Sequence, residues 1–347
     1  MVTRRDVARL AGTSEAVVSY VLNDGPRGVA PATKERVLAA VAELGYRPNA
    51  VARSLRMQRT MTFGLVVPDN SNPFFAELAR SIEEVGFEYG YTMLLGNATD
   101  DEEREAAYVR TLLDRQVDGL MLAPSHGAST WTAELSEATV PRLVLDRELP
   151  IPNAAHVLVD NAAGGYAATR HLVEHGRRRI GCLAGIAGAH PTVDRVAGWQ
   201  RALREADIDP AAMPLMHTPF GREHGYQGGR KLLAGSDSLD ALFIASDEQA
   251  IGLLRAAAEL GVKVPDDVAI CSFDGIGASA YTVPSLTTVR QPLEEIGRYA
   301  VEWLVAQVAD RDRPPSRVVL DTTLVLRGSC GCPEPTGDDS SSTDGTW

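Results

Sequence analysis

Hydrophobic residues recur at helical spacing in three short segments of the first 46 residues. The first segment begins at Thr3 and Asp6, which resemble a capping box, and stops at Gly12, because glycine tolerates the left-handed conformation that follows a helix. Ser14 can cap the second segment, and Pro31 suits the first turn of the third. The apolar positions expected to face a shared core are Val7, Ala8, Leu10, Ala11, Val17, Val18, Val21, Leu22, Val37, Leu38, Val41 and Leu44. The pattern therefore predicts three helices, with a tight turn between the first two.

From residue 61 onward, the pattern changes to short apolar runs that alternate with amphipathic stretches. The runs predicted as strands are 62–67, 91–96, 119–123, 143–146, 157–159, 179–184, 241–245 and 268–273. The stretches predicted as helices are 73–90, 101–115, 161–175, 192–206, 222–233 and 247–259. Strands and helices in alternation are typical of parallel α/β sheets. About 270 residues is long for a single sheet, so we expect two similar subdomains.

Positive and negative residues are unevenly distributed between the first 60 residues and the rest of the chain. Residues 1–60 carry a net charge of +5 and the remainder carries −17, which gives −12 for the whole chain. Clustered cations are the electrostatic signature of nucleic-acid binding, whereas an acidic body repels phosphate. Two short helices joined by a tight turn form a helix-turn-helix, whose second helix enters the major groove. A small helical bundle without a DNA role is the alternative that the pattern alone leaves open.

Two motifs favour the DNA-binding interpretation by resemblance. Residues 3–19 read T-x-x-D-V-A-x-x-A-G-x-S-x-x-x-V-S, and residues 46–56 read YRPNAVARSLR. Together they closely resemble the lactose/galactose repressor family of bacterial regulators, and the resemblance extends to about residue 328. It implies an N-terminal all-α helix-turn-helix headpiece and a parallel α/β body of the periplasmic-binding-protein type, with a ligand cleft between two subdomains. It also implies a homodimer that binds a pseudo-palindromic operator in double-stranded DNA.

The resemblance suggests a division of the chain into four parts. A DNA-binding domain covers residues 1–46, and a hinge helix and linker cover 47–60. An effector-binding and dimerisation core of two subdomains covers 61–330. The remaining residues, 331–347, are polar and poor in apolar side chains, so we expect a disordered tail.

The residues that the resemblance assigns to DNA binding lie in the headpiece and the hinge. They are Thr3, Arg4, Ser14, Glu15, Ala16, Val17, Ser19, Tyr20, Asn23, Asn49, Ala52 and Leu55. The hinge helix, 49–56, is too short to be stable alone in water, so folding on DNA is physically reasonable. Leu55 matches the leucine that wedges into the minor groove and bends the duplex, with the small Ala52 beside it. Ordinary packing against the body is the alternative role for Leu55.

Several base-reading positions depart from the family pattern. The family often has Thr and Arg where this chain has Val17 and Tyr20, and an aliphatic residue where it has Arg4. The outward positions that lead the second helix are Glu15, which can accept from cytosine N4, and Ala16, which can touch a thymine methyl. We therefore expect an operator that differs from the best-known ones.

Polar side chains follow several predicted strands, at the edge where α/β sheets bind their ligands. The candidate effector-binding residues are Phe74, Asp146, Arg195, Phe220, Ser246 and Asp274. Four of them match family positions by resemblance; Phe74 is a weaker candidate, and Ser246 stands where sugar-responsive members often have Asn. Carboxylates and a guanidinium beside aromatic faces suit a sugar or another small polar effector. The alternatives are helix caps for the carboxylates, a surface ion pair for Arg195 and core packing for the phenylalanines.

Cysteine and histidine usage predicts no metal site and no cofactor. The four cysteines form no disulfide framework in a chain of this length, and Cys182 and Cys271 lie in apolar runs that predict core positions. Cys330-Gly-Cys332 could bind a metal, but no partner pair stands nearby in the sequence. His171 and His175 are one helical turn apart with no third ligand of fitting spacing, which favours a solvated helix face.

The rival class of function is an enzyme or a solute-binding protein on the same α/β fold. The sequence has no G-x-x-x-x-G-K-[ST] and no G-x-S-x-G, and the run that begins at Gly275 lacks the third glycine of a dinucleotide loop. No apolar run reaches membrane-spanning length, and charged residues stand where a signal peptide would be apolar. We therefore expect a cytoplasmic, ligand-responsive transcriptional repressor with no catalytic residues and no membrane association.

Overall fold

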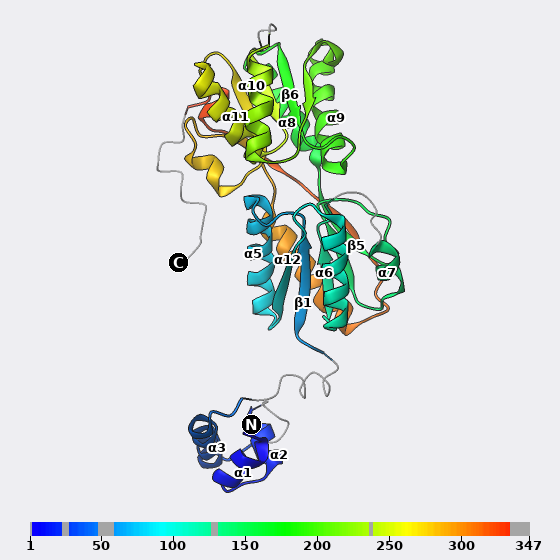
Figure 1. The fold of residues 1–347 in the computed structure, drawn as a ribbon, viewed down its shortest axis with the longest axis vertical. Helices are drawn as coiled ribbons and strands as arrows, with labels where there is room; N and C mark the ends of the chain where they lie inside the picture. The colour runs from blue at the N-terminus through cyan, green and yellow to red at the C-terminus, as the bar shows by residue number, and fades with distance from the viewer. Residues whose placement is uncertain (1, 23–27, 48–58, 126–130, 236–238, 334–347) are drawn as a thin grey trace. The chain divides into compact units, whose positions relative to one another are not determined.

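The structure, a computed structural model, describes residues 2–22, 28–47, 59–125, 131–235 and 239–333. The chain divides into two compact units, Met1–Thr60 and Met61–Trp347, and each has its own hydrophobic core (Figure 1). Asn23, the hinge residues Asn49, Ala52 and Leu55, and residues 334–347 of the predicted tail lie outside the described residues. None of the helices within the described ranges is long and apolar enough to cross a membrane.

The headpiece consists of α1 (Arg4–Leu10), α2 (Glu15–Leu22) and α3 (Pro31–Leu44). The predicted capping box is confirmed, because Asp6 N–H donates to Thr3 Oγ1 and Thr3 N–H donates to Asp6 Oδ2. Gly12 follows α1 with φ +60°, in the left-handed region where glycine is favoured. These local signals end α1 sharply and allow α2 to start at Glu15.

The headpiece core is smaller than the hydrophobic pattern predicts. Its fully buried members are Val7, Ala8, Ala11, Val18, Val37, Ala40 and Tyr46. Leu10 and Leu38 were expected in the core, but they are 46% and 45% exposed. A short helix buries one stripe of side chains along its length. A residue one or three positions from the centre of that stripe can lie beside it and stay exposed. Val37, Ala40, Val41 and Leu44 form the stripe of α3, which leaves Leu38 outside it.

The body contains two six-stranded sheets. The first has the order β11-β5-β4-β3-β1-β2, and the second has the order β12-β10-β9-β8-β6-β7. The strands of the first sheet are β1 (Thr62–Val67), β2 (Thr92–Asn97), β3 (Gly119–Leu122), β4 (Arg142–Leu145), β5 (Ala155–Val159) and β11 (Arg317–Leu320). Those of the second are β6 (Ile180–Ala184), β7 (Leu215–His217), β8 (Ala241–Ile244), β9 (Ala269–Asp274), β10 (Thr287–Arg290) and β12 (Thr323–Val325). All the recorded pairings are parallel except β10 with β12.

Both sheets are wound in the same order, β2-β1-β3-β4-β5 in the first half and β7-β6-β8-β9-β10 in the second. This order reverses direction beside β1 and beside β6, and α/β sheets bind ligands at the carboxyl ends of strands near such a reversal. The predicted pair of similar α/β subdomains is therefore what the chain forms, and it locates the edge where a ligand site is expected.

Helices cover both faces of each sheet (Figure 1). On the first sheet, α5 (Pro73–Glu88) and α12 (Leu293–Ala309) pack on one face, and α6 (Glu102–Asp114) and α7 (Trp131–Glu137) pack on the other. On the second, α8 (Asn161–Glu174) and α9 (His190–Glu205) lie opposite α10 (Arg222–Leu233) and α11 (Asp247–Leu260). Three 3-10 turns complete the elements: η1 (Pro210–Ala212), η2 (Gly277–Tyr281) and η3 (Gly328–Cys330).

The main omission of the sequence analysis lies after residue 274, where no element was predicted. The chain there returns from β10 of the second sheet to α12, which packs against α5 on the first sheet. It then adds β11 to the first sheet and β12 to the second. With the link from β5 to α8, the two halves are joined by three crossings near residues 160, 291 and 321. The apolar positions of α12 recur at helical spacing, so the signal for this helix was present in the sequence.

Two glycines allow helix backbones to come into direct contact in the second half. An added Cβ on Gly198 of α9 would collide with the carbonyl oxygen of Ala162 on α8. An added Cβ on Gly252 of α11 would collide with the carbonyl oxygen of Arg222 on α10. A clash with backbone cannot be relieved by a side-chain rotation, so these positions fix the close approach of the helices that carry the candidate site.

We expect Gly252→Ala to destabilise the body by roughly 1–3 kcal/mol, the usual cost of overpacking. Its thermal unfolding midpoint, measured by circular dichroism, should fall by several degrees. The matched control is Gly86→Ala in α5, where an added Cβ would be 3.9 Å from Tyr91 O, an ordinary contact. Alanine favours helix by about 1 kcal/mol over glycine, so the control should be neutral or stabilised. Equal midpoints for the two variants would contradict the close-packing assignment.

Candidate functional site

A pocket lies in the body at the carboxyl ends of strands from both sheets. The residues that line it are Pro68, Asp69, Asn72, Phe74, Phe75, Asp100, Asp146, Arg147, Ile186, Pro191, Arg195, Phe220 and Asp274. The enclosed cavity is about 50 Å³, and the rest of the space among these residues is open to solvent. The pocket therefore stands where the winding of the two sheets predicts a ligand site.

Arg195, on α9, is the most connected side chain of the pocket and is 3% exposed. Its Nε donates to Asn161 Oδ1 at 2.8 Å, and its Nη1 donates to Ala245 O at 2.6 Å and to Asp274 Oδ1 at 3.3 Å. The guanidinium carbon lies 3.8 Å from the centre of the Phe273 ring. Among the described residues, no hydrogen bond is recorded for Nη2, which leaves that nitrogen for a ligand.

Asp274 ends β9 and faces Arg195. Its φ of 112° lies in the region that side chains other than glycine rarely adopt, and Gln291 Nε2 donates to its Oδ1 at 2.9 Å. Burial raises the pKa of Asp274 to about 8, and the charge of Arg195 opposes that rise. Strained backbone and a shifted carboxyl are more common at functional sites than elsewhere. The pair therefore has the features of a binding centre, and the surface ion pair considered for Arg195 is excluded by its burial.

A second guanidinium enters the pocket from the first half of the body. Asp146, with φ of 66°, and Arg147 follow β4 and both line the pocket. Arg147 is buried; its Nε lies 3.5 Å from Asp146 Oδ2 and has no hydrogen-bond partner among the described residues. A buried donor without a partner is costly, and a ligand oxygen would satisfy it. Arg147 was not among the effector-binding candidates predicted from the sequence.

Aromatic side chains form apolar walls of the pocket. Phe74 is buried at the start of α5, where Asn72 Oδ1 accepts from its N–H at 3.0 Å, and its ring meets Phe75 edge-on with centres 5.0 Å apart. Phe220 precedes α10 and is half-buried, and its ring centre lies 5.9 Å from the guanidinium carbon of Arg195. Both phenylalanines line the pocket, so they are in place to contact the apolar face of a ligand.

Ser246 is not among the residues that line the pocket. It is buried at the start of α11, where its hydroxyl accepts from Gln249 N–H at 3.2 Å and so caps the helix. Its neighbour Asp247 is fully buried and accepts hydrogen bonds from the hydroxyls of Ser272, Ser279 and Thr288 and from the backbone N–H groups of Gly275 and Ile276. The geometry gives both residues a structural role, and Asp247 fixes the loop that follows Asp274.

The headpiece places the base-reading candidates of α2 along one exposed face. Glu15 and Ala16 are exposed, and Val17, Ser19 and Tyr20 are half-buried. Three further candidates lie outside α2. Ser14 Oγ accepts a hydrogen bond from Val17 N–H at 3.3 Å. Thr3 is exposed and caps α1, and Arg4 is half-buried. The predicted cap at Ser14 is therefore confirmed. The exposed start of α2 has the orientation that a recognition helix needs.

The sequence matches the family of bacterial regulatory proteins named after lacI over residues 3–49, and a periplasmic binding protein-like domain over residues 169–330. The HTH-type transcriptional repressor PurR of Vibrio vulnificus is 34% identical over 333 residues, covering 94% of this chain and 98% of that relative. The chain belongs to the lacI family of bacterial regulatory proteins. The fold class expected from the sequence, a helix-turn-helix headpiece on a periplasmic-binding-protein-like α/β body, is thereby confirmed.

Two solved structures show what lacI-family relatives bind. The transcriptional regulator CelR in complex with cellobiose is 33% identical with a TM-score of 0.71, and the match covers 95% of this chain and 100% of that chain. A lac repressor dimer bound to operator and the anti-inducer ONPF is 26% identical with a TM-score of 0.83, covering 95% of this chain and 99% of that chain. Ligand-controlled regulation of transcription is thus the function of the family, with repressors among its relatives.

Asp274→Asn should change how stability depends on pH. Because the pKa of Asp274 is raised from 3.8 to about 8, its stabilising contribution is present below pH 4 and is lost as the pH rises to 8. The thermal midpoint of the unmodified chain relative to the variant should therefore fall between pH 5 and pH 8. Hydrogen bonding to Arg317 lowers the pKa of Glu148, so Glu148→Gln should show the opposite trend, with the advantage of the unmodified chain lost on acidification. A pH-independent difference for Asp274→Asn would contradict the assignment.

Proposed function

We propose that this protein is a transcriptional repressor of the cytoplasm that binds an operator through α2 and takes a small polar effector of the sugar class in the pocket. The buried Arg195–Asp274 pair at the pocket carries this conclusion, because it supplies ligand-binding chemistry on the same chain as a lacI-type headpiece. The proposal assigns no enzymatic activity to the chain. The pocket groups have binding roles in it, and the relatives are regulators of transcription.

The chemistry of the pocket supports a polyhydroxyl ligand. Carboxylates from both halves, at Asp69, Asp146 and Asp274, can accept from hydroxyl groups, and the guanidiniums of Arg147 and Arg195 can donate to them. Flat phenylalanine walls suit the C–H faces of a sugar ring. The CelR relative binds cellobiose, which agrees with this class of ligand. A nucleobase is the alternative, because a planar ring could also lie against Phe74 or Phe220.

The construction of the body supports control by rotation of its halves. Pocket residues come from both sheets, and three crossings connect the sheets, so a ligand that contacts both halves would prefer one relative angle. Glu77 Oε1 on α5 accepts from the Gly277 N–H of the second half at 3.0 Å, a contact that such a rotation would change. A ligand shifts this equilibrium only by its difference in affinity for the two states.

Dimerisation is supported by a relative and by exposed apolar side chains. The solved lac repressor relative is a dimer on its operator. In this chain Tyr281 and Val283 are 88% and 94% exposed, and Phe87 of α5 is 77% exposed. Large exposed apolar side chains are enriched at protein interfaces. A homodimer would place two α2 helices on the half-sites of a pseudo-palindromic operator.

Arg195→Ala should weaken effector binding by roughly ten- to a hundred-fold, because a hydrogen bond to a charged group contributes about 1.5–3 kcal/mol. Sugars, polyols and nucleobases would first be screened by thermal shift, and the affinity of the hit measured by calorimetry. Arg201→Ala, on the same helix but exposed and paired with Glu205, is the control and should bind normally. Operator binding without effector should survive in both variants. Unchanged affinity in Arg195→Ala would place the ligand elsewhere.

Glu15→Ala and Tyr20→Ala should change which operator sequence is preferred, since a wrong base contact costs roughly 1–3 kcal/mol. Glu35→Ala, an exposed carboxylate on α3, removes the same charge and should change overall affinity without changing the preferred bases. Selection from a randomised duplex library would give the preference of each variant. The salt dependence of binding should follow a slope of about −0.9 per neutralised phosphate. Identical selected sequences for all three variants would exclude α2 as the base-reading element.

A further inference from the structure

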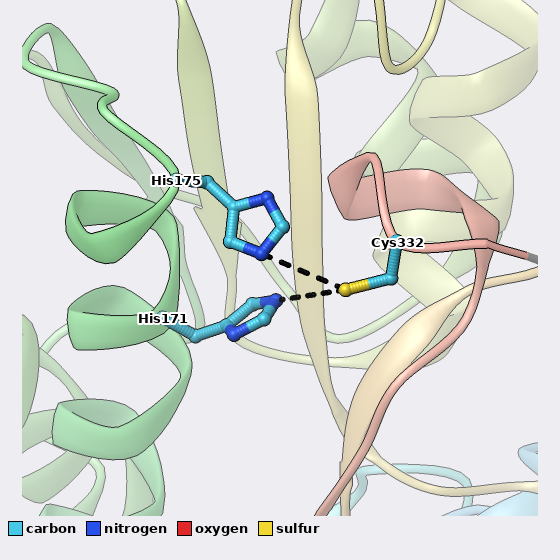
Figure 2. A group of neighbouring side chains, drawn as sticks. All are labelled: His171, His175 and Cys332. Atoms are coloured by element: carbon cyan, nitrogen blue, oxygen red, sulfur yellow. Dashed lines mark hydrogen bonds between the residues drawn. The ribbon is translucent and has the colours of Figure 1, made fainter.

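Three potential metal ligands that lie far apart in the sequence, two histidines and one cysteine, meet on one side of the second half of the body. His171 lies on α8 and His175 follows directly after its last residue, while Cys330 and Cys332 lie at and just after η3. Figure 2 shows both imidazoles and the Cys332 thiol pointing toward one another. Cys332 Sγ lies 3.7 Å from His171 Nε2 and 3.6 Å from His175 Nε2, and Cys330 Sγ lies 3.2 Å from His171 Nε2. The sequence offers no partner near either pair, and the fold brings the two pairs together.

The backbone on the cysteine side of this cluster is held firmly. Ser329 Oγ donates to Ile270 O at 2.8 Å and accepts from Thr287 N–H at 2.8 Å, which ties η3 to β9 and β10. Cys330 is buried, and Thr287 Oγ1 donates to its sulfur at 3.0 Å. Gly331 has φ of 97°, a turn that favours glycine and is followed directly by Cys332, which contacts α8. The thiols are thus positioned by the fold.

The histidine side is also fixed before any ligand binds. α8 buries Ala168 and Leu172 in the core of the second half, and this packing sets which face of the helix carries the two imidazoles. Residues four apart lie on the same helical face, and the two ring centres are 4.4 Å apart. A site whose ligands are held in place loses little conformational entropy on binding a cation.

The separations match those of a tetrahedral metal centre. With Zn–N of about 2.0–2.1 Å and Zn–S of about 2.3 Å, tetrahedral angles place nitrogen and sulfur ligands about 3.6 Å apart. The two distances from Cys332 Sγ are 3.6 and 3.7 Å, and the ligand atoms of His171, His175 and Cys332 all lie within 4.8 Å of one another. Three atoms with these separations can share one cation.

Hydrogen bonds alone satisfy this cluster only in part. His171 Nε2 faces both sulfurs, and a single proton on that nitrogen or on one thiol serves one of these contacts at a time. Cys332 Sγ in turn faces two nitrogens with one proton. One cation at the centre would accept lone pairs from both imidazoles and from the Cys332 sulfur, and the thiol proton of Cys332 would leave to solvent.

We propose that His171, His175 and Cys332 bind a single Zn²⁺-type transition-metal ion, with water as the fourth ligand. Imidazole and thiolate are the donors that zinc prefers, and a zinc site with three protein ligands keeps its fourth position for water. The cation joins η3 and the residues after it to the carboxyl-terminal end of α8. This site is separate from the pocket and is independent of the proposed effector, because none of its ligands lines that pocket.

The test uses the full chain produced without a polyhistidine tag, dialysed against metal-free buffer and loaded with Zn²⁺ or Co²⁺. Mass spectrometry of the bound metal should give one ion per chain. Co²⁺ should give the thiolate-to-metal charge-transfer band and the intense visible bands of tetrahedral coordination. Loading should raise the thermal unfolding midpoint by several degrees, and a chelator should reverse the rise.

The variants Cys332→Ser and His175→Gln should each lower the affinity for Zn²⁺ at least ten-fold and abolish or weaken the Co²⁺ charge-transfer band. Cys330→Ser should keep the charge-transfer band, because Cys332 supplies the thiolate. His224→Gln, an exposed histidine on α10, is the control and should behave like the unmodified chain. Circular dichroism checks that each variant folds. Failure of the unmodified chain to retain Zn²⁺ or Co²⁺, or equal retention by the folded Cys332→Ser and His175→Gln variants, would overturn the site.

Discussion

The buried guanidinium of Arg195 is the interaction on which the floor of the pocket depends. A buried charge is tolerated only when it is paired and hydrogen-bonded, and each partner of Arg195 comes from a different element: Asn161 at the start of α8, Ala245 after β8 and Asp274 at the end of β9. The side chain itself is on α9. Four elements must therefore be correctly placed before this charge is satisfied, and the Gly165 and Gly198 contacts between α8 and α9 make that placement possible.

The two halves of the body share a fold but offer different chemistry to the pocket. The second half supplies Arg195 and Asp274, which are joined to each other by a hydrogen bond of 3.3 Å and held by further partners within the same half. The first half supplies Asp146 and Arg147, where the Arg147 Nε has no hydrogen-bond partner within the described part of the chain. A ligand held by the second half could therefore gain its additional hydrogen bonds from the first half. Differential binding of this kind is what a shift between two arrangements of the halves requires.

The sequence predicted the features that depend on local signals. The capping box at Thr3, the left-handed turn at Gly12 and most of the strand–helix alternation follow from short patterns, and the pocket edge follows from the strand ends. The direction of a side chain after a strand depends on backbone angles that the sequence does not reveal. This is why Ser246 was taken for a ligand contact although it caps a helix, and why Arg147 was missed.

Long-range proximity was the other limit of the sequence analysis. His171 and Cys332 are separated by most of the second half of the body, and only the return of the chain through β12 and η3 brings them together. α12 was overlooked for a different reason. Its apolar positions recur at helical spacing, but the sequence alone does not show that a helix after residue 274 returns to the first sheet.

The crossings of the chain also determine the order in which the body can be completed during synthesis. The first sheet needs α12 and β11, residues 293–320, to cover one face and one edge, and the ribosome makes these after nearly the whole second half. A nascent chain emerges from its amino terminus, so the apolar face formed by Phe63, Leu65 and Ile82 stays uncovered while β6 to β10 are still being made. The first half of the body is therefore begun first and completed almost last. Its apolar face stays exposed until α12, encoded some 230 codons downstream, has been synthesised.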